Sequence, residues 1–159
     1  MQTNTKLKTS KLDIEIQYAS PAIESTLVKV ASSTLIKKWV KVTTNSVGLL
    51  TLRFVNAAEG KKLNTAYRQK NYATNVLTFP YERSKNSVAA DIIFCLPVIQ
   101  KEAKAQKKTL KAHLAHLVVH GCLHAQGFDH EAEKDAKKME TIEISLLKKL
   151  GFPNPYLAT

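Results

Sequence analysis

The chain has 159 residues, a length that suits one globular domain with its own hydrophobic core and leaves little room for a second. Apolar residues make up 44% of the chain and charged residues 23%, which excludes a disordered polypeptide. The 24 basic residues outnumber the 13 acidic ones, and the formal charge of +11 favours a polyanion such as RNA as partner, although an anionic membrane surface or plain solubility would also fit.

We expect neither export nor membrane insertion for this sequence. Residues 1–10 are polar and lack an apolar stretch of signal-peptide length. No later segment approaches the roughly 20 apolar residues that a membrane span needs. Cys95 and Cys122 lie in apolar surroundings outside any paired-cysteine motif, as inert core thiols of a reducing compartment usually do. We therefore expect a cytoplasmic protein with no membrane partner.

The first third of the chain predicts two strands around one helix. Apolar and polar residues alternate over residues 12–18 and 48–55, which is the period of a half-buried strand. Ser20 and Pro21 are typical of a helix start, because serine caps the helix and proline fits its first turn. Apolar residues then recur at helical spacing to about residue 40. We expect a single helix over this stretch.

The middle of the chain predicts a short helix and two further strands. The expected elements are a helix over residues 57–66, a strand over 75–79, a polar turn over 81–87 and a last strand over 88–96. Gly60 weakens the helix prediction, since glycine disfavours a helix interior. Pro80 and Pro97 are expected to stop the two strands.

The second half of the chain predicts helices alone, over residues 98–107, 109–126 and 131–149. Gly151 and Pro153 follow the last helix, as is common at helix C-termini. Together the elements predict an α+β fold, with a single domain in which a small mixed sheet of about four strands is packed by five or six helices. We expect this domain to span residues 12–156 after a basic, flexible N-terminus over residues 1–11.

All five histidines lie between residues 113 and 130. On a helix, four of them fall within roughly 80° around the axis and form one stripe: His113, His116, His120 and His124. Most other positions of this helix are apolar, which indicates a buried helix. The imidazoles are therefore expected to line an internal wall or the floor of a cleft.

Spacing selects which histidines can share a metal ion. His120 and His124 lie one turn apart, whereas His116 and His124 are separated by about 12 Å along the axis, too far for zinc–nitrogen bonds of about 2.0–2.1 Å. Gly127 can end the helix in a left-handed conformation and turn the chain back, so that His130 supplies a third nitrogen. Three histidines leave a fourth tetrahedral position for water, as in catalytic zinc sites.

Other readings of these residues stay open. Helical histidines often cap, pair or pack, and an isolated H-x-x-x-H pair would be weak evidence for a metal. His113 is expected to line the wall or support the ligands rather than bind the ion, and so is His116. In zinc proteases of the H-E-x-x-H type a glutamate follows the first histidine, but here that residue is Gly121. Asp129 is the candidate general base, or else it orients a histidine ligand.

The segment H-G-C-L-H-A-Q-G-F-D-H resembles the signature of the YbeY-type endoribonucleases, also called ribosomal RNA maturation factors. A second segment over residues 63–80, L-N-T-A-Y-R-Q-K-N-Y-A-T-N-V-L-T-F-P, resembles another stretch of that family. The resemblance covers about residues 12–156. This chain departs from the family pattern in a short stretch between Tyr81 and Asp91 and in Ala90, where the family usually has glycine.

The resemblance implies a zinc-dependent endoribonuclease that acts on single-stranded RNA, with one Zn²⁺ ion held by His120, His124 and His130 plus water. It implies a role in 16S ribosomal RNA 3′-end maturation and ribosome quality control, and so contact with ribosomal RNA and the small ribosomal subunit. Arg68 carries over as the arginine associated with activity, where it would clamp the scissile phosphate. Asp129 stays the second catalytic candidate.

Further residues have both a functional and a structural interpretation. Without the resemblance, Arg68 would be taken for a surface ion-pair residue. Three aromatic residues near it are candidates for stacking on bases: Tyr67, Tyr72 and Phe79, the last equally suited to the core. Asp91 is expected to be structural. Eight lysines could form a track for a polyanion or simply a solvated surface: Lys61, Lys62, Lys70, Lys101, Lys104, Lys107, Lys108 and Lys111.

Two other function classes remain alternatives. A metallopeptidase-like hydrolase would share the metal geometry, but it would need a general base that position 121 does not supply. A non-catalytic ribosome-assembly factor would carry a structural zinc. A substitution at His124 that abolishes RNA cleavage without unfolding the protein would separate these possibilities from the nuclease.

Overall fold

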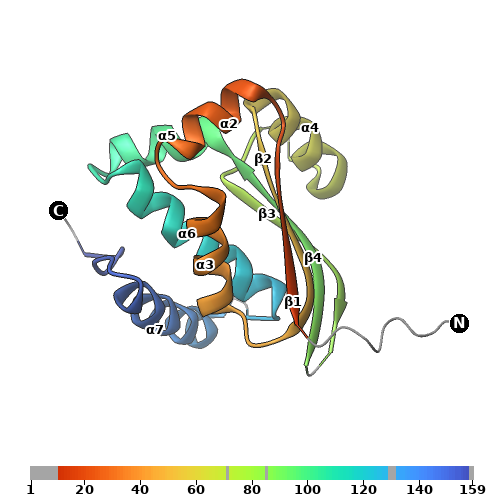
Figure 1. The fold of residues 1–159 in the computed structure, drawn as a ribbon, viewed down its shortest axis with the longest axis vertical. Helices are drawn as coiled ribbons and strands as arrows, with labels where there is room; N and C mark the ends of the chain where they lie inside the picture. The colour runs from red at the N-terminus through yellow and green to blue at the C-terminus, as the bar shows by residue number, and fades with distance from the viewer. Residues whose placement is uncertain (1–10, 71, 85, 129–131, 158–159) are drawn as a thin grey trace, which may run out of the picture.

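The structure is a computed structural model that describes residues 11–70, 72–84, 86–128 and 132–157. Residues 1–10, nearly all of the predicted flexible N-terminus, lie outside the described part. The helices and strands below carry the labels of Figure 1. Within the described residues no helix is both long enough and apolar enough to cross a membrane.

The centre of the fold is a four-stranded mixed sheet with the order β1-β2-β4-β3. Its strands are β1 (Leu12–Tyr18), β2 (Val47–Val55), β3 (Val76–Arg83) and β4 (Ser87–Cys95). The first two pairs in this order are parallel, and β3 pairs with β4 in the antiparallel direction. Both parallel pairs are connected through helices, as parallel neighbours require. The predicted mixed sheet of about four strands is confirmed.

Six helices accompany the sheet in the described residues: α2 (Pro21–Val28), α3 (Ser33–Thr43), α4 (Ala57–Arg68), α5 (Leu96–Ala105), α6 (Leu110–Ala125) and α7 (Glu133–Lys149). In Figure 1, α3 and α6 lie on one side of the sheet, α7 packs outside α6, and α4 lies at the opposite side. The helix count agrees with the α+β prediction.

The core consists of two hydrophobic clusters, one on each face of the sheet. The larger cluster joins the inward side chains of β2 and β4, such as Leu52 and Phe94, to apolar residues of α3, α6 and α7. The smaller cluster, which includes Val55 and Cys95, packs under α4 around Leu63. Helix α6 has buried residues on nearly all of its sides. Packing on all these sides fixes its position relative to the sheet.

The prediction of one helix from Ser20 to about residue 40 was wrong. The first helix, α2, ends at Val28. The turn after it is closed by a hydrogen bond from the N–H of Ala31 to the Leu27 carbonyl at 2.8 Å. A new helix then begins, because the Ser32 hydroxyl accepts a hydrogen bond from the Leu35 N–H at 3.1 Å. Apolar residues keep the helical spacing across this break, so the sequence pattern did not reveal that Ser32 caps a second helix.

The prediction that Pro80 stops its strand was also wrong, and the polar turn expected over 81–87 is shorter. Strand β3 continues through Pro80 to Arg83 with a shift of register between Pro80 and Glu82. Proline is tolerated there because β3 is an edge strand, so its missing N–H is not needed by a neighbouring strand.

Candidate metal centre

Helix α6 presents the histidines from a buried position. The Thr109 hydroxyl caps the helix by accepting a hydrogen bond from the Ala112 N–H at 3.1 Å. Most of the helix is buried between the sheet and the other helices, and His113 is buried with it. His116, His120 and His124 are each partly exposed. The stripe therefore forms a wall that faces partly outward, whereas the sequence predicts an internal wall or the floor of a cleft.

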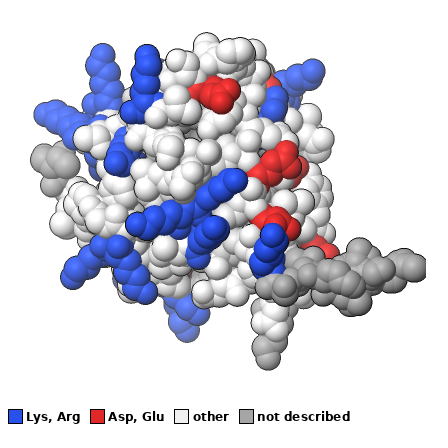
Figure 2. All heavy atoms as spheres, in the orientation of Figure 1, with Lys and Arg blue, Asp and Glu red and all other residues white. Residues whose placement is uncertain are grey.

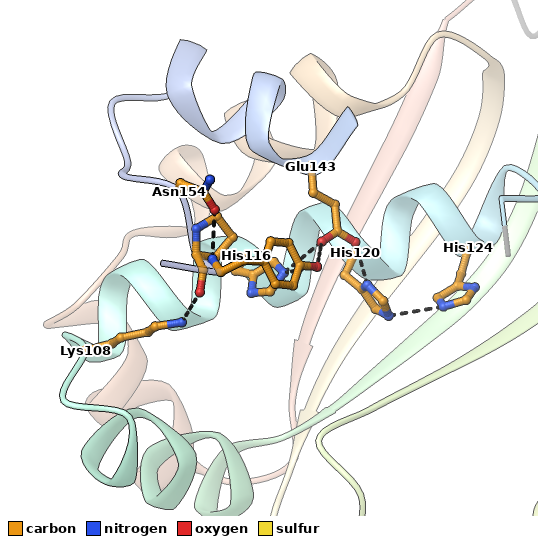
Figure 3. Close-up of polar contacts among 8 residues, drawn as sticks. Lys108, His116, His120, His124, Glu143 and Asn154 are labelled. Atoms are coloured by element: carbon orange, nitrogen blue, oxygen red, sulfur yellow. Dashed lines mark hydrogen bonds and ion pairs between the residues drawn. The ribbon is translucent and has the colours of Figure 1, made fainter. Parts of the chain in front are cut away.

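His120 and His124 point their Nε2 atoms at each other (Figure 3). These two nitrogens lie 3.1 Å apart, and the ring planes make an angle of 82°. Two nitrogens bonded at about 2.0–2.1 Å to one tetrahedral zinc ion would lie about 3.3 Å apart. The pair therefore fits two ligands of a single ion, and imidazole is a ligand type that zinc accepts.

The turn after α6 has the predicted geometry. Gly127 adopts a left-handed φ of 103°, and its N–H bonds to the His124 carbonyl at 3.0 Å. The N–H of Phe128 bonds to the Leu123 carbonyl at 3.1 Å, which completes a glycine-ended helix terminus. The helix thus ends at Ala125, and the chain turns at Gly127, three residues after the second histidine of the pair.

The third predicted ligand cannot be placed. His130 and the candidate base Asp129 both lie outside the described residues. Within the part of the chain that is described, no group of three or more His, Cys, Asp or Glu side chains is arranged to hold a metal ion. The structure therefore brings together two of the three predicted ligands and leaves the role of His130 as a prediction.

Glu143 of α7 connects two of the histidines, a contact that sequence reasoning missed. Its side chain is fully buried, and its carboxylate lies 2.8 Å from His116 Nε2 and 2.6 Å from His120 Nδ1. The hydroxyl of Tyr156 donates to the same carboxylate. Burial by itself would raise the pKa of Glu143, but the bonds to His116, His120 and Tyr156 outweigh it and hold the pKa at about 2. Glu143 is therefore an anion among these donors.

A signal for Glu143 was present in the sequence. Met139, Glu143 and Leu147 are spaced four residues apart and are the residues of α7 that are fully buried. An acidic residue on such an apolar stripe needs partners, because an unpaired buried charge is very unfavourable. The position of Tyr156 gives no comparable signal, since it follows α7 in an irregular segment.

A second histidine–carboxylate pair lies nearer the start of α6. His113 Nε2 is 2.9 Å from Glu102 of α5, which also accepts a bond from the Asn75 amide at 3.1 Å. Burial lowers the pKa of His113, although the Glu102 contact opposes the shift. His113, His116 and His120 line one pocket of about 330 Å³, which Asn75 and Tyr156 also border.

The packing around Gly121 explains why no glutamate follows the first predicted ligand, His120. Helix α6 approaches the sheet so closely at this residue that a side chain would meet Ile92 and Val76. Position 121 therefore points into the core rather than toward the histidine pair. A general base at this position, as in the H-E-x-x-H proteases, is sterically excluded by the packing.

Arg68 is exposed at the C-terminal end of α4, where Gln69 caps the helix in a left-handed conformation with φ 57°. It is not among the described residues that line the histidine pocket. The chain reaches that pocket further on, at Asn75. Beside Arg68, Tyr67 is exposed and packs edge-on against Phe79 at 5.1 Å between ring centroids.

The remaining candidates are Asp91 and the eight lysines, which lie outside the histidine pair. Asp91 accepts a hydrogen bond from the Tyr81 hydroxyl at 2.5 Å, which agrees with a structural role. Of the eight lysines that were considered as a track for a polyanion, seven are exposed and Lys108 is half-buried. In Figure 2, basic side chains gather on the side of the molecule that carries α3, α5, α6 and α7. That side would attract a polyanion.

Comparisons with known proteins agree with the resemblance seen in the sequence. The model of the family described as Endoribonuclease YbeY matches residues 8–151. A Polynucleobacter asymbioticus protein of that name is 73% identical over 150 residues, covering 94% of this chain and 97% of the relative. A Herminiimonas arsenicoxydans protein of the same name is 48% identical and covers 95% and 99%.

The fold also matches a solved structure. The solution structure of Thermotoga maritima TM1509 aligns with a TM-score of 0.53 over 87% of this chain and 91% of that one. The sequences are 23% identical, so this likeness supports the fold alone.

Proposed function

Because the chain belongs to the endoribonuclease YbeY family, we propose that it is an endoribonuclease that cleaves single-stranded RNA with one zinc ion, bound by His120, His124 and His130. The observation that carries the metal assignment is the pair of Nε2 atoms 3.1 Å apart. The left-handed turn at Gly127 supports His130 as the third ligand, because it ends the helix three residues before that histidine.

The reaction divides between the metal and the chain. When bound, zinc would supply positive charge that activates a water molecule or polarises a phosphoryl oxygen. Arg68 grips the scissile phosphate, since its planar guanidinium donates to two oxygens at once. Asp129 accepts the proton or orients a histidine, and its place next to His130 in the sequence supports either role. The lysines on α5 and α6 attract the negatively charged RNA strand.

The substrates we propose are ribosomal RNA, including the 16S 3′ end, with a part in ribosome quality control on the small subunit in the cytoplasm. The resemblance of residues 63–80 and of the histidine segment to the YbeY-type endoribonucleases supports this assignment. The formal charge of +11 is consistent with a polyanionic substrate.

The packing at Gly121 weighs against the metallopeptidase alternative. That chemistry uses a glutamate directly after the first ligand, and here the position faces Ile92 in the core. A cleavage assay with casein beside one with RNA tests the point directly. We expect cleavage of the RNA only.

The test of the proposal begins with metal analysis of the purified protein and cleavage of a single-stranded RNA with and without a chelator. We expect about one zinc per chain and loss of cleavage on chelation. His124→Ala should stay folded and lose both zinc and cleavage. His113→Gln is the matched control on the same helix and should retain both. Undiminished cleavage by His124→Ala would exclude a catalytic metal at this site.

A further inference from the structure

We propose that Glu143 is a positioning residue for the metal: it holds His120 with its proton on Nδ1, so that Nε2 faces His124, and Tyr156 holds Glu143 in turn. The inference rests on the proposed function, because it concerns how the same two histidines are prepared for an ion. It extends the metal site from the histidine segment to α7 and to the segment that follows it.

The tautomer of His120 follows from the chemistry of its partner. An ionised carboxylate only accepts hydrogen bonds, so the Nδ1 atom that lies 2.6 Å from Glu143 Oε2 must carry a proton. In a neutral imidazole the other nitrogen then presents a lone pair. That nitrogen, Nε2, lies 3.1 Å from His124 Nε2 (Figure 3). The lone pair on His120 Nε2 is therefore directed toward His124 Nε2, where an ion bound by both imidazoles would lie.

Glu143 is held in position from three directions. His116 Nε2 lies 2.8 Å from Oε1, His120 Nδ1 contacts Oε2, and the Tyr156 hydroxyl contacts Oε1. The carboxylate is fully buried on α7, so water does not compete for these contacts. A carboxylate so constrained fixes the orientation of the rings that donate to it. His116 thereby acts with Glu143 without being a ligand.

The C-terminal segment is fastened to the same network. The Asn154 side chain accepts a hydrogen bond from the Tyr156 N–H at 2.8 Å, and the Lys108 ammonium donates to the Pro155 carbonyl. Both bonds are drawn in Figure 3: the first lies within the segment after α7, and the second ties that segment to the connection between α5 and α6. Tyr156 is therefore held in place by contacts other than the one to Glu143, and it can fix the position of the Glu143 carboxylate.

Zinc affinity tests the proposal in the full-length protein, by competition with a chromogenic chelator at pH 8. Glu143→Gln keeps the side-chain shape and removes the charge, and we expect zinc affinity to fall about 10- to 100-fold. Tyr156→Phe should lower the affinity by a smaller factor. Glu102→Gln is the matched control, because Glu102 makes the same kind of bond to His113. It should bind zinc like the parent protein.

Circular dichroism and thermal melting of each metal-free variant separate a positioning role from a loss of fold. Zinc affinity of Glu143→Gln equal to that of the parent would overturn the proposal, and so would an equal loss in Glu102→Gln. If the parent protein cleaves RNA and binds zinc while Glu143→Gln binds equally well, only this inference fails. If the parent protein binds no zinc, the proposed function fails with it.

The tautomer can be measured without any variant. Nitrogen-15 NMR of the metal-free parent protein at pH 8 distinguishes protonated from bare imidazole nitrogens. We expect His120 to carry its proton on Nδ1. A proton on Nε2, with Nδ1 bare, would overturn the proposal even if Glu143→Gln did not fold.

Discussion

Gly121 lies so close to Ile92 that a Cβ atom built on the glycine would be 2.8 Å from Ile92 Cγ2. The same Cβ would be 3.4 Å from Val76 Cγ2 on the edge strand. Helix α6 therefore lies directly on β3 and β4 at the residue that follows the first proposed ligand. The distance between helix and sheet at this point sets how deeply the histidine pair is seated.

Gly121→Ala should lower the free energy of unfolding, although alanine is the better helix former. Overpacking of a core costs about 1–3 kcal/mol, whereas the gain in helix propensity is about 1 kcal/mol. Urea denaturation of the metal-free protein measures the difference. In an Ile92→Ala background the substitution should be less harmful, with a coupling energy of about 0.5–3 kcal/mol. Equal effects in both backgrounds would show that the contact is relieved by other movements.

Gly48→Ala should be far more destabilising than Gly151→Ala. Both glycines have positive φ, 134° and 91°, and both substitutions therefore strain the backbone. At Gly48 a Cβ would also lie 1.9 Å from the Val88 carbonyl oxygen, whereas nothing lies within 4 Å at Gly151. We expect a loss of about 1–2 kcal/mol at Gly151 and of about 4 kcal/mol or more at Gly48. Similar losses in chemical denaturation would contradict the register of β2 against β4.

His113 should make the metal-free protein less stable as the pH falls below about 6.5. Burial lowers its pKa in the folded state, so the unfolded chain takes up a proton first and gains stability from it. The groups that face it are Glu102 of α5, Lys108 before α6, and His116. Denaturation midpoints between pH 7.5 and 5.5, with chelator present, measure the slope.

Two variants check the assignment of that slope. His113→Gln removes the titrating group and should flatten the dependence on pH. Glu102→Gln removes the contact that opposes the shift, so the pKa of His113 should fall further and the loss on acidification should grow. An unchanged slope in His113→Gln would mean that another group titrates in this range.

Arg68→Ala should reduce kcat/KM for single-stranded RNA by about 100- to 1000-fold, the usual effect of removing one transition-state donor. Arg68→Lys should restore little, because an ammonium cannot grip two oxygens as a planar fork does. Zinc affinity should not change in either variant. Lys62→Ala removes an exposed cation from the same helix and is the matched control. Full activity of Arg68→Ala would remove Arg68 from the mechanism.

Neither cysteine should react with a thiol reagent in the folded protein at pH 8. Both are buried, and burial raises the pKa of Cys122 to about 12 and raises that of Cys95 as well. Thiolate is the reactive form, so labelling should follow unfolding. Colorimetric thiol titration with and without urea measures this. Rapid labelling of the native protein would contradict the packing of α6, which carries Cys122, or of α4, which covers Cys95, against the sheet.

The features that the sequence determined by itself are those decided within one or two helical turns. His120 and His124 share a face because residues four apart lie one above the other on a helix. Gly127 and Gly151 end their helices because only glycine adopts such a conformation without strain. Alternating side chains correctly predicted β1 and β2, since the period of a strand is also local.

Only the tertiary structure decided which distant residues meet. Pro80 stays within a strand because β3 lies at the edge of the sheet, and strand order is not written in any single segment. Glu143 contacts His120 across 23 residues, and Tyr156 contacts His116 across 40. Periodicity shows that a face of α7 is buried but not which side chains of α6 it meets. The charge of Glu143 is stable in the core only because those partners arrive from other elements.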